Sequence, residues 1–114
     1  MASISLTKVI EKMKLENYTP DIDLKHIKII QPDINRPALQ LAGYFEHFET
    51  TRLQIIGFVE YSYMGAMTQD RKKEIYEELL HTDCPGVVFC RDMKPDDLFL
   101  ETAERKGVPV LGTK

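Results

Sequence analysis

Residues 87–111, VVFCRDMKPDDLFLETAERKGVPVL, decide the fold of this chain. The stretch begins with an apolar run at 87–90 and ends with a second apolar run at 108–111. Between the two runs, Pro95 is typical of the first position of a helix and Gly107 is typical of a helix end. The stretch therefore predicts two buried strands joined by a helix, which is the connection that parallel strands need.

The same alternation of strand and helix extends towards the N-terminus. Residues 53–59, LQIIGFV, form a nearly continuous apolar run that predicts a further strand. Thr68 is a suitable N-cap for a helix that continues to about His81, with Ile75 and Leu79 one turn apart. The second half thus reads β-α-β-α-β, with right-handed crossovers. We expect an α/β fold, a small mainly parallel sheet with helices on both faces.

The first half carries weaker signals. Ser5 is a plausible N-cap of a helix that ends near Met13, because apolar residues recur there at helical spacing. Short extended segments are expected at 15–18 and 26–30. No low-complexity linker divides the sequence, so we expect residues 1–114 to form one domain.

Composition and charge narrow the class of protein. The 43% hydrophobic and 29% charged residues are ordinary for a globular domain and argue against disorder. The net charge of −3 argues against nucleic acid as a partner, because such binding needs a basic surface. The apolar run at 86–90 is too short to cross a membrane, and residues 1–5 lack the features of a signal peptide. These observations predict a cytoplasmic protein without a membrane partner.

The two cysteines, Cys84 and Cys90, do not have the spacing of a redox or zinc pair. We expect two reduced thiols, with Cys90 as a small buried side chain in a strand. A disulfide or a shared metal ion is the alternative, which a cytosolic setting disfavours.

The sequence holds no motif of a known catalytic or cofactor site. Neither the P-loop pattern G-x-x-x-x-G-K-S/T nor the dinucleotide pattern G-x-G-x-x-G occurs. Ser62 lacks the G-x-S-x-G turn of a nucleophile. The dispersed histidines do not form a metal-binding pair; they are His26, His47 and His81. We therefore predict no catalytic residue, no metal ligand and no cofactor-binding residue in this chain.

One polar segment, residues 33–43, is the exception. Pro37 and Gly43 fit the beginning and end of a two-turn helix. Polar side chains crowd the start of this helix: Asp33, Asn35, Arg36 and Gln40. The free N–H groups of a helix start and a guanidinium could receive an anionic ligand. Alternatively, the aspartate or asparagine caps the helix and the arginine pairs with a neighbouring acid.

Residues 33–48, DINRPALQLAGYFEHF, resemble the most characteristic stretch of the HPr kinase/phosphorylase N-terminal domain, D-I-N-R-P-G-L-x-L-A-G-(Y/F)-F. Ala38 stands where glycine is common. Residues 52–57, RLQIIG, are similar to a strand of that family, and the segments at 84–88 and 107–111 also match its pattern. The resemblance covers nearly the whole chain.

This resemblance implies a domain without catalytic residues. Enzymes of the family phosphorylate a serine of the phosphocarrier HPr with ATP or pyrophosphate and Mg²⁺, and they remove that phosphate by phosphorolysis. They control carbon catabolite repression as homohexamers. Their P-loop and catalytic carboxylate belong to a C-terminal kinase domain, which would be the first partner of this chain. The resemblance also implies a fold similar to the N-terminal domain of Mur ligases, although a fold does not transmit a function.

Three functions follow as hypotheses. The first is a non-catalytic regulatory or assembly domain of the serine kinase/phosphorylase. The second is a stand-alone module that binds an anionic small molecule through the polar segment at 33–43. The third is an independent enzyme, against which the missing nucleophile, base and metal patterns argue.

Overall fold

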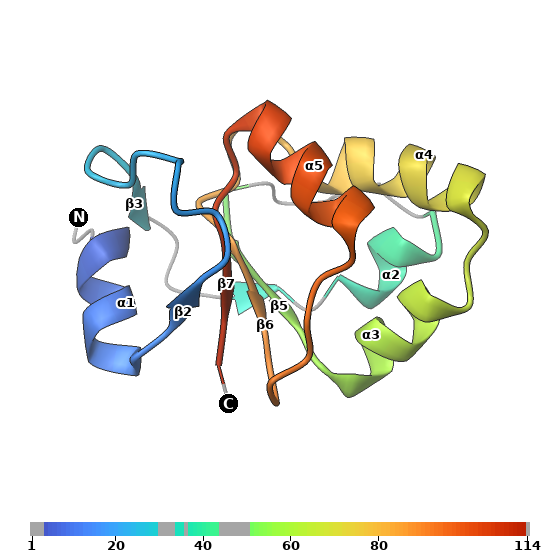
Figure 1. The fold of residues 1–114 in the computed structure, drawn as a ribbon, viewed down its shortest axis with the longest axis horizontal. Helices are drawn as coiled ribbons and strands as arrows, with labels where there is room; N and C mark the ends of the chain where they lie inside the picture. The colour runs from blue at the N-terminus through green and yellow to red at the C-terminus, as the bar shows by residue number, and fades with distance from the viewer. Residues whose placement is uncertain (1–3, 30–33, 36, 44–50, 114) are drawn as a thin grey trace.

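The computed structural model describes residues 4–29, 34–35, 37–43 and 51–113 (Figure 1). Within them, a sheet has the strand order β2-β7-β6-β5-β4. Strands β4 to β7 run parallel, and β2 pairs antiparallel with β7. The strands are β2 (Glu16–Asn17), β4 (Ile34–Asn35), β5 (Leu53–Ile56), β6 (Val87–Phe89) and β7 (Val110–Gly112). This arrangement confirms the predicted α/β fold with a small, mainly parallel sheet.

Helices cover both faces of the sheet, as predicted. Four helices lie on one face in Figure 1: α2 (Ala38–Leu41), α3 (Phe58–Gly65), α4 (Gln69–Leu79) and α5 (Asp97–Lys106). The other face carries α1 (Leu6–Met13) and a small antiparallel pair, β1 (Ile4–Ser5) and β3 (Lys28–Ile29). The described part of the chain thus has three layers, with the sheet in the middle.

The strand residues alternate between the two faces, as the pleat of a strand requires. Val87 and Phe89 are buried in the large cluster under α2 to α5, whereas Val88 belongs to the smaller cluster that packs against α1. In β7, Val110 and Leu111 divide in the same way. Both faces of the central strands are therefore apolar, which explains their continuous hydrophobic sequence.

The predicted helix ends are confirmed at three places. The Ser5 hydroxyl accepts a hydrogen bond from the Lys8 N–H at 3.4 Å, and the Thr68 hydroxyl accepts one from the Arg71 N–H at 3.2 Å. Gly107 ends α5 in the left-handed region, at φ 74°. Each of these ends is set by a local side chain or by the freedom of glycine, so it could be read from sequence.

The prediction of one strand over residues 53–59 is wrong in its second half. The strand ends at Ile56, and Phe58 begins the helix α3. The physical reason is a helix start at Gly57, whose N–H donates to the Glu60 side chain at 2.7 Å. This contact replaces the ladder hydrogen bonds that would have continued the strand.

Smaller corrections concern other boundaries. Helix α5 begins at Asp97 and not at Pro95. Asp96 is its N-cap, because the Asp96 side chain accepts the Phe99 N–H at 2.7 Å. The strand predicted at 108–111 is observed at Val110–Gly112. Helix α2 has a single turn of four residues instead of the predicted two turns. Cys90 follows β6 and is half-buried, whereas Cys84 is the buried cysteine.

Candidate functional site

The predicted polar site at the start of α2 is only partly described. Asp33 and Arg36 lie outside the described residues. Asn35 is the last residue of β4 and lies opposite Gln54 in the parallel register. Gln40 is in α2 and is buried, with 7% of its surface exposed. Anion binding by this segment therefore stays a prediction.

A hollow lies at the carboxyl edge of the parallel strands, where open α/β sheets usually bind ligands. Its volume is about 370 Å³, and it lies where β5 and β6 end. We call it the carboxyl-edge hollow. Its lining residues are Ile55, Gly57, Phe58, Val59, Cys90 and Arg91. Sequence reasoning did not find it, because the two lining segments are distant in the sequence and meet only through strand pairing.

Backbone hydrogen bonds hold the two sides of the carboxyl-edge hollow together. The Cys90 N–H donates to the Ile56 carbonyl at 3.0 Å, which joins the ends of β5 and β6. Arg91 and Asp92 both have left-handed backbone angles, at φ 55° and 59°. The Asp92 N–H donates to the Thr113 carbonyl at 2.7 Å. The hollow thus offers apolar side chains, one guanidinium and one thiol on a firm backbone frame.

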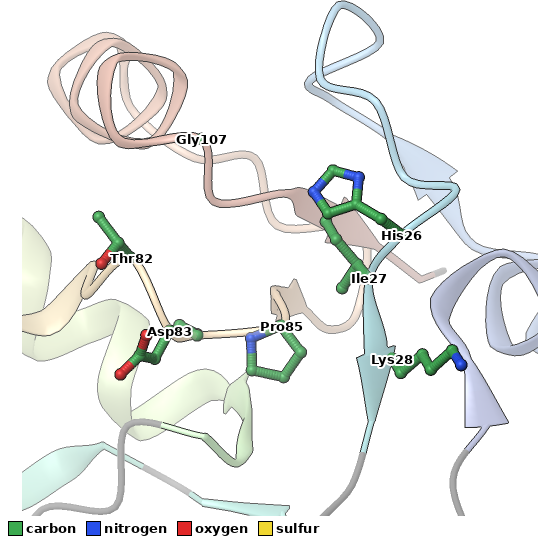
Figure 2. Close-up of a pocket in the computed structure, with 8 residues that line it drawn as sticks. His26, Ile27, Lys28, Thr82, Asp83, Pro85 and Gly107 are labelled. Carbon is green, nitrogen blue, oxygen red and sulfur yellow. The ribbon is translucent and has the colours of Figure 1, made fainter.

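A second hollow, of about 230 Å³, lies at the opposite edge of the sheet (Figure 2). Its polar side chains do not converge on one point. Lys28 and Asp83 point away from each other, and His26 comes from the loop before β3. Asp83 instead lies beside His81, whose Nδ1 accepts the Asp83 N–H at 3.1 Å. This arrangement lacks the paired groups that acid–base chemistry requires.

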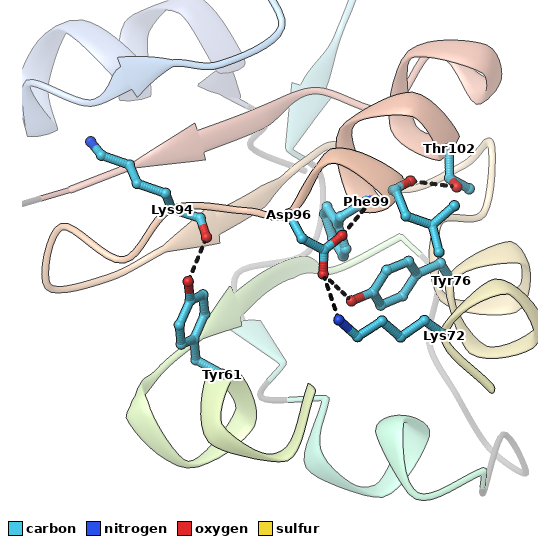
Figure 3. A network of polar contacts seen from close by, with 8 residues as sticks. Tyr61, Lys72, Tyr76, Lys94, Asp96, Phe99 and Thr102 are labelled. Atoms are coloured by element: carbon cyan, nitrogen blue, oxygen red, sulfur yellow. Dashed lines mark hydrogen bonds and ion pairs between the residues drawn. The ribbon is translucent and has the colours of Figure 1, made fainter. Parts of the chain in front are cut away.

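A polar network joins α4 to α5 (Figure 3). Besides capping α5, the Asp96 carboxylate accepts the Tyr76 hydroxyl at 2.8 Å and the Lys72 ammonium at 3.4 Å. Burial and the neighbouring Asp96 raise the pKa of Tyr76 well above its usual value. The phenol is therefore a permanent donor, and the network holds two helices in place.

Two further reactive groups, Cys84 and Lys94, are also in structural settings. Burial raises the pKa of the Cys84 thiol to about 12, which makes it a poor nucleophile at neutral pH. Hydrogen bonds to Tyr18 and Asp92 raise the pKa of Lys94, so its ammonium stays charged. Lys94 lies 3.1 Å from the Tyr18 hydroxyl and 3.0 Å from the Asp92 carboxylate. Neither group has a partner that would activate it for catalysis.

Three further properties of the described residues concern metal ions, buried polar atoms and membranes. Within those ranges, no group of three His, Cys, Asp or Glu side chains lies close enough to hold a metal ion. Every buried side-chain nitrogen or oxygen there has a hydrogen-bond partner. No helix in the same part of the chain is long and apolar enough to cross a bilayer.

Comparison with known proteins places the chain in one family. Residues 4–114 match the family described as HPr Serine kinase N terminus. The HPr kinase/phosphorylase of Lachnoclostridium phytofermentans is 46% identical over 114 residues, which are 100% of this chain and 37% of the relative. The enzyme of Caldicellulosiruptor bescii is 37% identical over 94% of this chain and 34% of the relative. That of Streptococcus uberis is 32% identical over 98% of this chain and 36% of the relative.

The family match, residues 4–114, covers almost the whole chain. The chain itself spans little more than a third of the relatives' length, for example 37% of the Lachnoclostridium enzyme. The predicted resemblance is thereby confirmed, and the likeness to Mur ligases stays a prediction. The chain belongs to the HPr serine kinase N-terminal family and corresponds to the N-terminal domain of an HPr kinase/phosphorylase.

Proposed function

We propose that this chain is the non-catalytic, regulatory or assembly domain of a bifunctional HPr kinase/phosphorylase. The observation that carries the proposal is that the described polar groups of the domain hold its helices together and do not form a catalytic site. In the described residues, the network around Asp96 joins two helices and contains no nucleophile paired with a base. The relatives named HPr kinase/phosphorylase are much longer than this chain, which covers only 37% of the first of them.

The chemistry then belongs to the part of the enzyme that follows. We assign to that part the P-loop, the catalytic carboxylate, the binding of ATP or pyrophosphate with Mg²⁺, and the docking of HPr. A homohexameric, cytoplasmic enzyme that acts in carbon catabolite repression would fit this division. The N-terminal domain would influence assembly or regulation without touching the transferred phosphate.

Phosphate transfer to HPr by three proteins tests this division. They are the full-length enzyme, this chain alone and the region that follows residue 114. We expect transfer from ATP by the full-length enzyme and by the following region, and none by this chain. Transfer by this chain alone, or a following region that fails to bind ATP, would contradict the proposal.

A further inference from the structure

Helix α3 exposes large apolar side chains. Phe58 is 63% exposed, Val59 64% and Tyr63 48%. Val59 and Tyr63 are four residues apart and therefore share one side of the helix. Phe58 and Val59 also line the carboxyl-edge hollow, together with Arg91. We call these four residues the α3 patch.

The α3 patch is not needed for the core beneath the helix. Glu60 and Met64 are the buried residues of α3, at 3% exposure each. Glu60 accepts the Gly57 N–H and so fixes the start of the helix from the inside. The apolar side chains on the outer side remain in contact with water, which is unfavourable unless another surface covers them.

The last described residue, Thr113, lies at the same edge of the sheet as this patch. The Thr113 N–H donates to the Phe89 carbonyl at 2.9 Å, and the Thr113 carbonyl accepts the Asp92 N–H at 2.7 Å. Asp92 directly follows Arg91, which lines the carboxyl-edge hollow. In Figure 1 the end of β7 lies at the same edge of the sheet as the start of α3.

A large amount of polypeptide follows at this point in the relatives. The matched family is the N terminus of the enzyme, and the chain accounts for 37% of the length of the Lachnoclostridium relative. The larger part of the enzyme would therefore continue from the carboxyl edge of the sheet, where Thr113 is bound to Asp92. A surface that is joined to its partner by the same polypeptide meets that partner at a high effective concentration.

From this juxtaposition we propose that the α3 patch is the surface on which the downstream kinase region of the same enzyme packs. Phe58 and Val59 would be the apolar anchors of the contact, and Arg91 would lie at its polar rim. The inference deepens the proposed accessory role and rests on it, because it gives that domain a place of contact with the catalytic region. A second copy of this domain is the competing occupant.

Photo-cross-linking in the full-length enzyme tests the proposal. Phe58→p-benzoylphenylalanine and Val59→p-benzoylphenylalanine place the probe in the α3 patch. Met13→p-benzoylphenylalanine is the matched control, because Met13 is also 64% exposed but lies on α1, on the other face of the sheet. Two patch positions are used so that a folding defect in one variant leaves the other informative.

We expect both patch probes to cross-link to peptides that follow residue 114, with about tenfold higher yield than the control, since the probe reacts only with groups in contact. Cross-links to residues 4–113 of a second copy would overturn the proposal, as would a yield equal to that of the control. The kinase assay above is independent, because a cross-link reports contact whether or not the contact affects phosphate transfer.

Discussion

Helices α3 and α5 start at the same edge of the sheet but differ in the burial of their aromatic side chains. Each follows a parallel strand and has a defined start, at Gly57 for α3 and at Asp96 for α5. The aromatic residue of α5, Phe99, is fully buried against Tyr76 and Phe89. The first residue of α3, Phe58, is 63% exposed.

This difference separates a helix that is packed into the core from a helix that keeps apolar side chains exposed, for which we propose contact with the kinase region. Around α5, edge-to-face aromatic contacts and the Asp96 carboxylate combine in one rigid unit. Around α3, a buried Glu60 fixes the helix from below while apolar side chains face outward. The two helices can therefore be tested against each other with matched substitutions.

The largest effect should come from a pair of identical changes. Phe99→Ala removes a fully buried ring, so we expect a loss of about 4 kcal/mol in the free energy of unfolding. Phe58→Ala changes an exposed side chain and should cost no more than about 0.5 kcal/mol. Urea denaturation of this chain measures both. Equal losses would mean that α3 is as much a part of the core as α5.

The cap of α5 should give the next effect. Asp96→Ala removes the N-cap and leaves the Tyr76 hydroxyl without its acceptor, so we expect a loss of about 2 kcal/mol. Asp97→Ala, at the neighbouring exposed position, is the control and should cost about 0.5 kcal/mol. The comparison fails if the two variants have the same midpoint of thermal unfolding.

A smaller, pH-dependent effect should come from the ion pairs between α4 and α5. Hydrogen bonds from Arg105 and Lys106 hold the pKa of Glu77 below its usual value. A lowered pKa in the folded state stabilises the domain above the unfolded pKa, near 4.3, and this contribution is lost as the pH falls through the folded pKa. The side chains of Glu77 and Arg105 are exposed, so Glu77→Gln should cost only about 0.5 kcal/mol at pH 7.

Urea denaturation of the Glu77→Gln variant at pH 7 and near pH 3 measures this difference. The exposed neighbour provides the control variant, Glu78→Gln. We expect the loss measured at pH 7 to shrink in acid, where the Glu77 carboxylate is protonated. It should also shrink in high salt, which screens the ion pairs. A loss that stays constant with pH and salt would assign the role of Glu77 to packing instead of charge.

Local signals in the sequence predicted much of the fold. Thr68 and Gly107 mark helix ends through their own chemistry, and the apolar runs at β6 and β7 could be recognised as buried parallel strands. Helix α3 was missed because Phe58 and Val59 extend the apolar run of β5 and favour a strand by composition. The signal for it was glycine followed three residues later by Glu60, which is a capping pattern.

The sites were harder to predict than the fold, because they depend on contacts between distant segments. Sequence reasoning placed Cys90 inside and gave Cys84 no particular role, yet the packing around Gly86 buries Cys84. The carboxyl-edge hollow needs the register of β5 with β6, which sequence alone did not provide. Two of the four residues of the polar cluster, Asp33 and Arg36, lie outside the described residues, so anion binding there stays a prediction.

The most direct test of this account is the alkylation rate of Cys90 in this chain and in the full-length enzyme. Cys90 is half-buried and lines the carboxyl-edge hollow, whereas the buried Cys84 reports any unfolding during the reaction. With N-ethylmaleimide and peptide mass spectrometry, the account predicts labelling of Cys90 about tenfold slower in the full-length enzyme, because the kinase region covers the hollow. Equal rates in the two proteins, with Cys84 unlabelled in both, would contradict it.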